Sequence, residues 1–279
     1  MFNKILIILL FLNLSLHSQN SDLEYGVYNI GIGAFFGGIG GMINKTENQT
    51  LGNSFIKGFC NGAIGGYVTF ESKRLLRLAV QEQDWKLFWA SNILNAAGTS
   101  LKENAAMNKK LWNHWHLNFG FNRLEINLKE DKVFRYKIMP ISFSYITWAM
   151  FNEKFDIGRT LKYGQFYFWF NRTENLGYHR PGYIAINSKF LDSNIPLEIR
   201  YEQLYEIIGH EIVHVYQTND FLPINSTYQN YLKNDILKIS KFEKFLYLDF
   251  QHLLYFSLYS FNQNHDKNFF ENEARYFSN

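Results

Sequence analysis

Two runs of glycine residues spaced four apart constrain the fold of this chain more than any other feature. Their members are Gly33, Gly37 and Gly41 in the first run, and Gly58, Gly62 and Gly66 in the second. Glycines at this spacing leave a smooth groove on a helix, so two such helices can pack at very short distance. In water each helical glycine costs about 0.5–1 kcal/mol relative to alanine, so the runs need strong packing or lipid to persist. We therefore expect a helical hairpin over residues 27–68, with its turn in the polar stretch 44–54.

The surroundings of this hairpin remain open at the level of sequence. It can insert into or lean on a membrane, or it can be buried against the rest of the protein. An apolar run of about 17 residues is at the short limit for a membrane span, so length does not separate the two. Glycine-rich strands are a further alternative for the same stretch.

The first residues indicate where the protein goes. Residues 1–19 combine a basic start at Lys4, an apolar stretch from Ile5 to Leu12 and a small, polar end, which predicts a secretory signal peptide. Richness in Asn, Lys, Ile and Phe suggests a bacterial chain, so we expect export to the periplasm or to an outer-membrane-associated position. Cys60 is the single cysteine, so no disulfide framework supports the fold.

Charge and motif content exclude several functions. The net charge of +3 and the pI near 8.7 are too modest and too scattered to predict binding of nucleic acid. The glycines at 31–41 follow no predicted strand and lack a Lys-Ser/Thr ending, which excludes a nucleotide-binding phosphate loop. The aromatic content of 18% indicates large apolar surfaces, either in a core or beside a membrane.

The remaining pattern predicts an α+β fold with a helical region at 22–110 and a second region at 111–279. Residues 71–110 read as one or two helices, with a close helix–helix approach at 98–100. Alternating apolar and polar residues then predict an antiparallel meander of about five strands. These strands are expected at 116–126, 132–139, 141–150, 155–163 and 165–171. A last strand at 182–187 is expected to be the edge strand that faces a substrate peptide.

Residues 210–214 read His-Glu-Ile-Val-His and carry the chemistry of the chain. Two histidines four apart on a helix lie on one face, so His210 and His214 can converge on one zinc ion. Glu211 is then placed to take a proton from a zinc-bound water. A helix that begins near Pro196 and buries a separate apolar stripe would present the pair correctly. The alternative is that both histidines are ordinary surface residues of that helix.

A zinc site of this kind needs a third protein ligand and an open fourth position. Glu271 and Glu273 are the candidates, and on one helix they point roughly 200° apart, so only one can face the metal. Glu271 is preferred because the small Ala274 shares its face and allows a close approach to the histidine helix. Glu273 remains the alternative, with a supporting role if it is not a ligand.

These two patches, His210-Glu211-x-x-His214 and Glu271-x-Glu273-Ala274, resemble the Glu-zincins. The similarity is to the branch that contains the prenyl-protein and membrane heat-shock metalloproteases, and it covers about 25 residues. The resemblance implies a zinc-dependent peptidase whose third ligand is a glutamate on a later helix. Arg275 departs from the family, which has Asp at that position.

Other polar residues are weaker candidates. His179, expected in a loop, could steady a developing oxyanion, although a loop histidine is more often solvated. Asp249 and His252, three apart, could orient a zinc-bound histidine, but a local pair on a helix is the simpler interpretation. His114 and His116 are interpreted as structural.

Two functions follow from these predictions. The first is zinc-dependent hydrolysis of a peptide or protein in the bacterial cell envelope, with Glu211 as the base. The second is a membrane-associated structural or assembly protein whose metal site is vestigial or structural.

Overall fold

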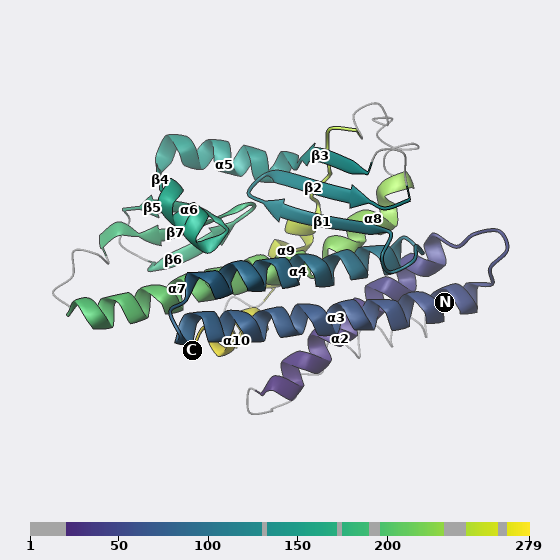
Figure 1. Cartoon of the computed structure of the whole chain (residues 1–279), viewed down its shortest axis with the longest axis horizontal. Helices are drawn as coiled ribbons and strands as arrows, with labels where there is room; N and C mark the ends of the chain where they lie inside the picture. The colour runs from purple at the N-terminus through teal and green to yellow at the C-terminus, as the bar shows by residue number, and fades with distance from the viewer. Residues whose placement is uncertain (1–20, 130–132, 172–174, 190–195, 232–243, 262–266) are drawn as a thin grey trace.

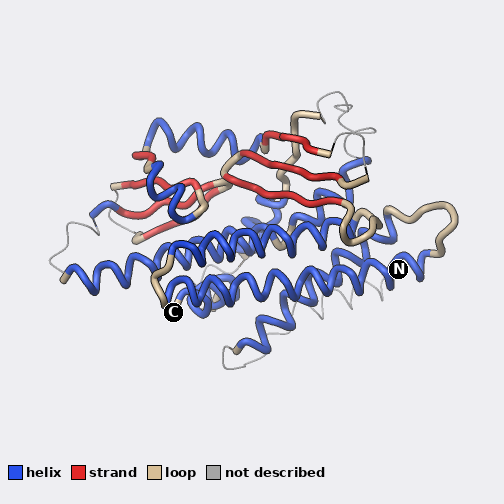
Figure 2. Tube along the Cα trace, viewed as in Figure 1, coloured by secondary structure: helices blue, strands red, loops and turns tan. Residues whose placement is uncertain are grey.

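The fold belongs to the α+β class, as predicted, and consists of a layer of long helices beside two small sheets (Figure 1, Figure 2). The computed structural model describes residues 21–129, 133–171, 175–189, 196–231, 244–261 and 267–279. The predicted signal peptide at 1–19 lies outside the described residues.

The N-terminal glycine runs form two packed helices, α2 (Asp22–Ile43) and α3 (Leu51–Gln81). A Cβ atom added at Gly62 would lie 2.1 Å from the carbonyl oxygen of Gly33, and one at Gly37 would lie 2.4 Å from that of Gly58. The two backbones therefore touch, with no room for any side chain between them. The predicted hairpin is confirmed, and the alternative of glycine-rich strands is wrong.

The third long helix, α4 (Trp85–Ala106), lies beside α3. A Cβ added at Gly98 would lie 2.7 Å from the backbone nitrogen of Thr69, so the predicted close approach at 98–100 is confirmed. Among the described residues, α2 alone has the length and apolar composition to cross a membrane, and 44% of its apolar window is buried inside the protein. Core helices and signal sequences share these properties, so membrane association through 27–68 stays a prediction.

Two sheets follow the helical layer. The first is an antiparallel meander of β1 (His114–Phe119), β2 (Asn122–Asn127) and β3 (Phe134–Ile138). The second has the order β4-β5-β7-β6, with β5 and β7 parallel and the other pairs antiparallel. Its strands are β4 (Lys154–Phe155), β5 (Phe166–Phe170), β6 (Gly177–Arg180) and β7 (Tyr183–Asn187).

The prediction of a strand at 141–150 is wrong, because this stretch is the helix α5 (Pro140–Asn152). Its alternation of apolar residues with serine resembles a half-buried strand. Pro140 instead occupies the first helical turn, where a missing N–H costs nothing. The carboxylate of Asp249 accepts hydrogen bonds from the backbone N–H groups of Ile141 and Ser142, at 2.9 and 2.8 Å, and so caps the helix.

Two other predicted strands are also corrected. The stretch 155–163 is mostly the helix α6 (Ile157–Tyr163), which begins at the capping residue Asp156 and ends at Gly164 with φ of +67°. The stretch 116–126 is not one strand, because Gly120 at φ of +61° turns the chain between β1 and β2. Glycine suits both positions because it adopts positive φ without steric cost.

The predicted edge strand at 182–187 forms as β7 but lies inside the sheet, between β5 and β6. The strand at that edge is β6, which precedes β7 in the chain. All five residues of β7 are buried, as expected of a strand covered on both sides.

The histidine motif lies on the long helix α7 (Leu197–Asn219), which starts after Pro196 as predicted. Leu204, Ile208 and Ile212 from its apolar stripe are buried in the largest core cluster, which also contains residues of α3, α10 and the second sheet. The chain continues through α8 (Leu222–Tyr231), α9 (Gln251–Ser260) and α10 (Phe269–Ser278). Because α10 packs along α7, residues far apart in sequence meet beside the motif.

Candidate metal centre

His210 and His214 lie on one face of α7, one helical turn apart. Their Nε2 atoms are 3.2 Å from each other. His214 is buried, whereas the side chain of His210 is 20% exposed. The pair therefore sits at the edge of the core with one histidine accessible from outside.

The carboxylate of Glu271 completes a triangle with the two imidazoles. Its two oxygens lie 3.2 Å from Nε2 of His210 and 3.3 Å from Nε2 of His214. Ligand atoms held about 2.0–2.1 Å from a tetrahedral zinc ion are separated by about 3.3 Å. The donor types fit a zinc ion, and one ligand atom from each residue lies within 4.8 Å of the other two.

Side chains behind His214 fix its orientation. Its Nδ1 lies 2.7 Å from Oε1 of Gln217 and 3.1 Å from the hydroxyl of Tyr255. The amide oxygen can only accept, so Nδ1 carries a proton, and in the neutral ring the lone pair of Nε2 points toward His210 and Glu271. The hydroxyl of Tyr259 donates to the Glu271 carboxylate. His214 and Glu271, two of the three candidate ligands, are therefore each held by a further hydrogen bond.

Glu273 faces away from the histidines, in a buried ion network between α10 and the N-terminal helices. Its carboxylate accepts hydrogen bonds from Lys73 and Asn29, each at 2.9 Å, and from Gln217, also at 2.9 Å. The carboxylate of Asp220 lies 2.9 Å from Lys73 and 2.6 Å from Lys102, so two lysines face two carboxylates. Of the two glutamates, the structure brings only Glu271 to the histidine pair; the ligand role itself stays a prediction.

Glu211 is buried next to this cluster and against the edge strand. A Cβ added at Gly177 of β6 would lie 2.9 Å from its carboxylate. The carboxylate of Glu211 makes no hydrogen bond to a side chain of the described residues. Burial, with a contribution from the charge of Glu271, raises the pKa of Glu211 to about 7. A carboxylate in these surroundings takes up and releases protons near neutral pH.

The charges of the candidate ligands depend on one another. Burial alone would raise the pKa of Glu271, but hydrogen bonds with His210 and His214 hold it far below its ordinary value. Burial alone would lower the pKa of His214, yet the hydrogen bond with Glu271 and the charge of Glu211 raise it. His214 therefore holds a proton more strongly beside these carboxylates than a free imidazole does, and a bound cation would take the place of that charge.

The prediction that His179 lies in a loop is wrong, because the residue is in β6. There its buried ring stacks on His214. The ring centroids lie 5.4 Å apart, and Phe256 stacks on its other face at 5.2 Å. Its Nε2 lies 3.4 Å from the hydroxyl of Thr218. Burial and the neighbouring His214 hold the pKa of His179 well below its ordinary value, so the ring is neutral.

Asp249 and His252 do not touch the histidine pair. Both instead contact Ser142, whose hydroxyl lies 2.7 Å from Oδ2 of Asp249 and 3.2 Å from Nε2 of His252. The possibility that they orient a zinc-bound histidine has no support in this geometry, because their contacts are with the start of α5.

A second group of residues of metal-binding types consists of Glu103, His114 and His116. Here Nδ1 of His116 lies 2.8 Å from the carboxylate, and the guanidinium of Arg123 lies 2.7 Å from the same oxygen. The hydroxyl of Tyr247 donates to the other oxygen at 2.6 Å. The guanidinium of Arg123 already balances the charge of this carboxylate. The cluster is therefore a buried ion network, and both histidines have a structural role in it.

Sequence reasoning missed Tyr255 and Tyr259 at the candidate metal centre. Their spacing of four on α9 places both on one face, a signal that was present but common to any apolar helix. Comparison of the chain with protein-family models, with curated proteins and with solved structures finds no match.

Proposed function

We propose that the chain is a zinc metallopeptidase of the bacterial cell envelope, with His210, His214 and Glu271 as zinc ligands. The observation that carries the proposal is the meeting of two imidazoles and one carboxylate. The two Nε2 atoms lie 3.2 Å apart, and each lies 3.2 or 3.3 Å from a different oxygen of Glu271. Two histidines and one carboxylate are also the ligand set of catalytic zinc sites that leave a fourth position open. The side chain of His210 is 20% exposed, which supports access of solvent to the site.

Zinc bound there would polarise a peptide carbonyl and acidify a water molecule. Glu211 would accept a proton from the attacking water and pass it to the leaving amine. Its burial and raised pKa favour this role, since a base with a pKa near the working pH both takes and returns the proton. Glu211 is close to the cluster without making a hydrogen bond to it, which distinguishes it from the ligands.

The substrate would bind along β6. This strand is at the edge of its sheet, and the carboxylate of Glu211 lies against its first residue, Gly177. An extended peptide can pair with such an edge through backbone hydrogen bonds. This arrangement replaces the expected role of 182–187, because β7 has partners on both sides.

Four variants of the purified protein test the proposal. Wild type should bind about one zinc ion per chain, and His214→Ala and Glu271→Gln should lose it, because too few ligands remain. Glu211→Gln should retain zinc and lose hydrolysis of a fluorogenic peptide library. Glu273→Gln is the matched control on α10, and it should keep the zinc while losing about 3 kcal/mol of stability from the broken ion network.

Each outcome has a defined meaning. Normal hydrolysis by Glu211→Gln would refute the assignment of the base. Loss of zinc from Glu273→Gln together with retention of zinc by Glu271→Gln would refute the assignment of the third ligand. Zinc binding by wild type without hydrolysis of any peptide would favour the alternative, a membrane-associated structural or assembly protein with a structural metal site.

A further inference from the structure

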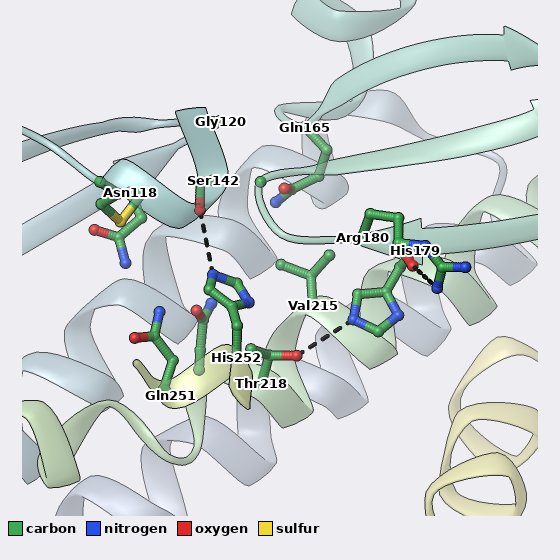
Figure 3. A pocket seen from close by; sticks show the side chains of 13 residues that line it. Asn118, Gly120, Ser142, Gln165, His179, Arg180, Val215, Thr218, Gln251 and His252 are labelled. Carbon is green, nitrogen blue, oxygen red and sulfur yellow. Dashed lines mark hydrogen bonds between the residues drawn. The ribbon is translucent and has the colours of Figure 1, made fainter. Parts of the chain in front are cut away.

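A small pocket lies beside the candidate metal centre and is used by none of the steps above. It has a volume of about 40 Å³ and lies between α7, the turn from β6 to β7, and the starts of α5 and α9 (Figure 3). Its walls include His179 and Arg180 from β6, Val215 and Thr218 from α7, and His252 from α9. Space for two or three water molecules is also space for one small side chain.

The pocket contains a buried polar atom without a partner. Nδ1 of His252 makes no hydrogen bond, although the residue is only 7% exposed. Figure 3 shows one nitrogen of this ring toward Ser142 and the other toward the middle of the pocket, near Val215. A buried polar atom without a partner is costly, and native proteins rarely leave one without a reason.

The neighbours of His252 determine which group this nitrogen can bind. The Ser142 hydroxyl donates its one proton to Asp249, whose carboxylate can only accept. The Ser142 oxygen must then accept from the Nε2–H of His252, at 3.2 Å. In the neutral ring, Nδ1 consequently carries no proton and acts as a hydrogen-bond acceptor. Its ligand must therefore bring an N–H or O–H donor.

The charge and the size of the pocket further limit which side chains can bind there. Arg180 is the one charged residue among those lining the pocket, and no lining residue is acidic. A lysine or arginine side chain would meet this positive charge without a carboxylate to compensate, so an uncharged donor is favoured. A volume of about 40 Å³ suits a short side chain with a hydroxyl group, such as serine or threonine.

The position of the pocket connects it to the candidate metal centre. Thr218 follows His214 by one helical turn, which is about 6 Å along the axis. His179 is shared, because it lines the pocket and stacks on His214. Neighbouring residues of an extended peptide are about 3.4 Å apart, so a peptide at the metal would place a side chain here within two residues of the cleaved bond.

We infer that this pocket is a specificity site for a serine or threonine side chain of the peptide substrate, with Nδ1 of His252 as the hydrogen-bond acceptor. The inference rests on the proposed peptidase function. Threonine and valine have nearly the same shape and differ in the hydroxyl group, so this pair of residues provides the test.

The first experiment compares peptide pools that carry threonine or valine at one position next to the cleaved bond and are otherwise random. Wild type should show kcat/KM about tenfold higher for threonine at one position, the value of one good hydrogen bond. In His252→Leu this ratio should fall to about one. The ratio is independent of how much enzyme is folded, and Leu253→Ala, an exposed neighbour, should leave it at tenfold.

The second experiment does not require turnover. Zinc-loaded Glu211→Gln labelled with ¹⁵N-histidine is titrated with N-acetylthreonine amide and with N-acetylvaline amide. The Nδ1 resonance of His252 should shift with the threonine compound alone. A selective shift without hydrolysis of any pool by wild type would support the pocket and refute the peptidase. Hydrolysis with equal rates for threonine and valine, or equal shifts, would overturn the inference.

Discussion

Gln217 connects the candidate metal centre to the buried ion network through one side chain. Its amide oxygen accepts from His214, and its amide nitrogen donates to Glu273 and to the backbone oxygen of Phe270. The amide can satisfy all these partners in only one orientation. The direction of the His214 ring is therefore set by contacts that reach α10, and Gln217 acts as a positioning residue.

Replacing Gln217 by leucine should lower zinc affinity about 10- to 100-fold, the usual effect of losing a residue that orients a ligand. Competition with a chromogenic chelator measures this change. Glu202→Ala, at an exposed position of the same helix, is the matched control and should bind zinc as wild type does. Equal affinities for Gln217→Leu and wild type would show that the ring of His214 is held by packing alone.

For single residues, sequence reasoning predicted the features that depend on the geometry of one helix. The convergence of His210 and His214 follows from a spacing of four. The 100° turn per residue indicates that Glu271 and Glu273 cannot both face one metal, and the small Ala274 on the face of Glu271 made that residue the preferred ligand. The sequence could not reveal that Glu273 accepts from Lys73, because that contact spans 200 positions. The network around Glu103 was not predicted either, because it depends on how α4 packs against β1 and β2.

At the scale of elements, the contact between α2 and α3 gives a sharp contrast between two glycines. A Cβ at Gly62 would lie 2.1 Å from the backbone of α2, whereas one at Gly31 would meet nothing within 4 Å. Gly62→Ala should thus force the helices apart and lower the free energy of unfolding by about 1–3 kcal/mol. Gly31→Ala should raise it by about 0.5–1 kcal/mol, because alanine restricts the unfolded chain.

Urea denaturation of both variants measures the difference. The two changes in the free energy of unfolding should have opposite signs, and two variants of equal stability would contradict the close packing.

The predicted hairpin was within reach of sequence reasoning because its signal is local. The helix α5 was not, because the residue that caps it, Asp249, lies 108 positions from Ile141 in the chain.

For the whole molecule, a buried histidine makes stability depend on pH. Burial and the charge of Arg123 lower the pKa of His116 to about 4, although Glu103 opposes them. The unfolded chain takes up a proton as the pH falls below about 6.5, whereas the folded protein does so only near pH 4. The contribution of His116 to stability is therefore complete above pH 6.5 and is lost between pH 6.5 and 4.

The comparison of wild type with His116→Gln isolates this group, because the other titrating residues are common to both. The difference in their unfolding free energies, measured in the presence of a chelator, should shrink as the pH falls from 7 to 4, by on the order of a few kcal/mol. A constant difference over this range would show that His116 has the same pKa in the folded and the unfolded protein.

The candidate ligands come from two distant parts of the chain, and this has a consequence for the lifetime of the protein. From His214 to Glu271 the chain runs 57 residues (271 − 214), so a bound ion would act as a cross-link that closes a long loop. By analogy with a disulfide of that span, the constraint is worth about 4 kcal/mol. Where zinc is scarce, α10 would detach more often and expose its backbone to proteases, as limited proteolysis with and without chelator would show. The supply of metal would then set how much of the protein persists as well as how fast it works.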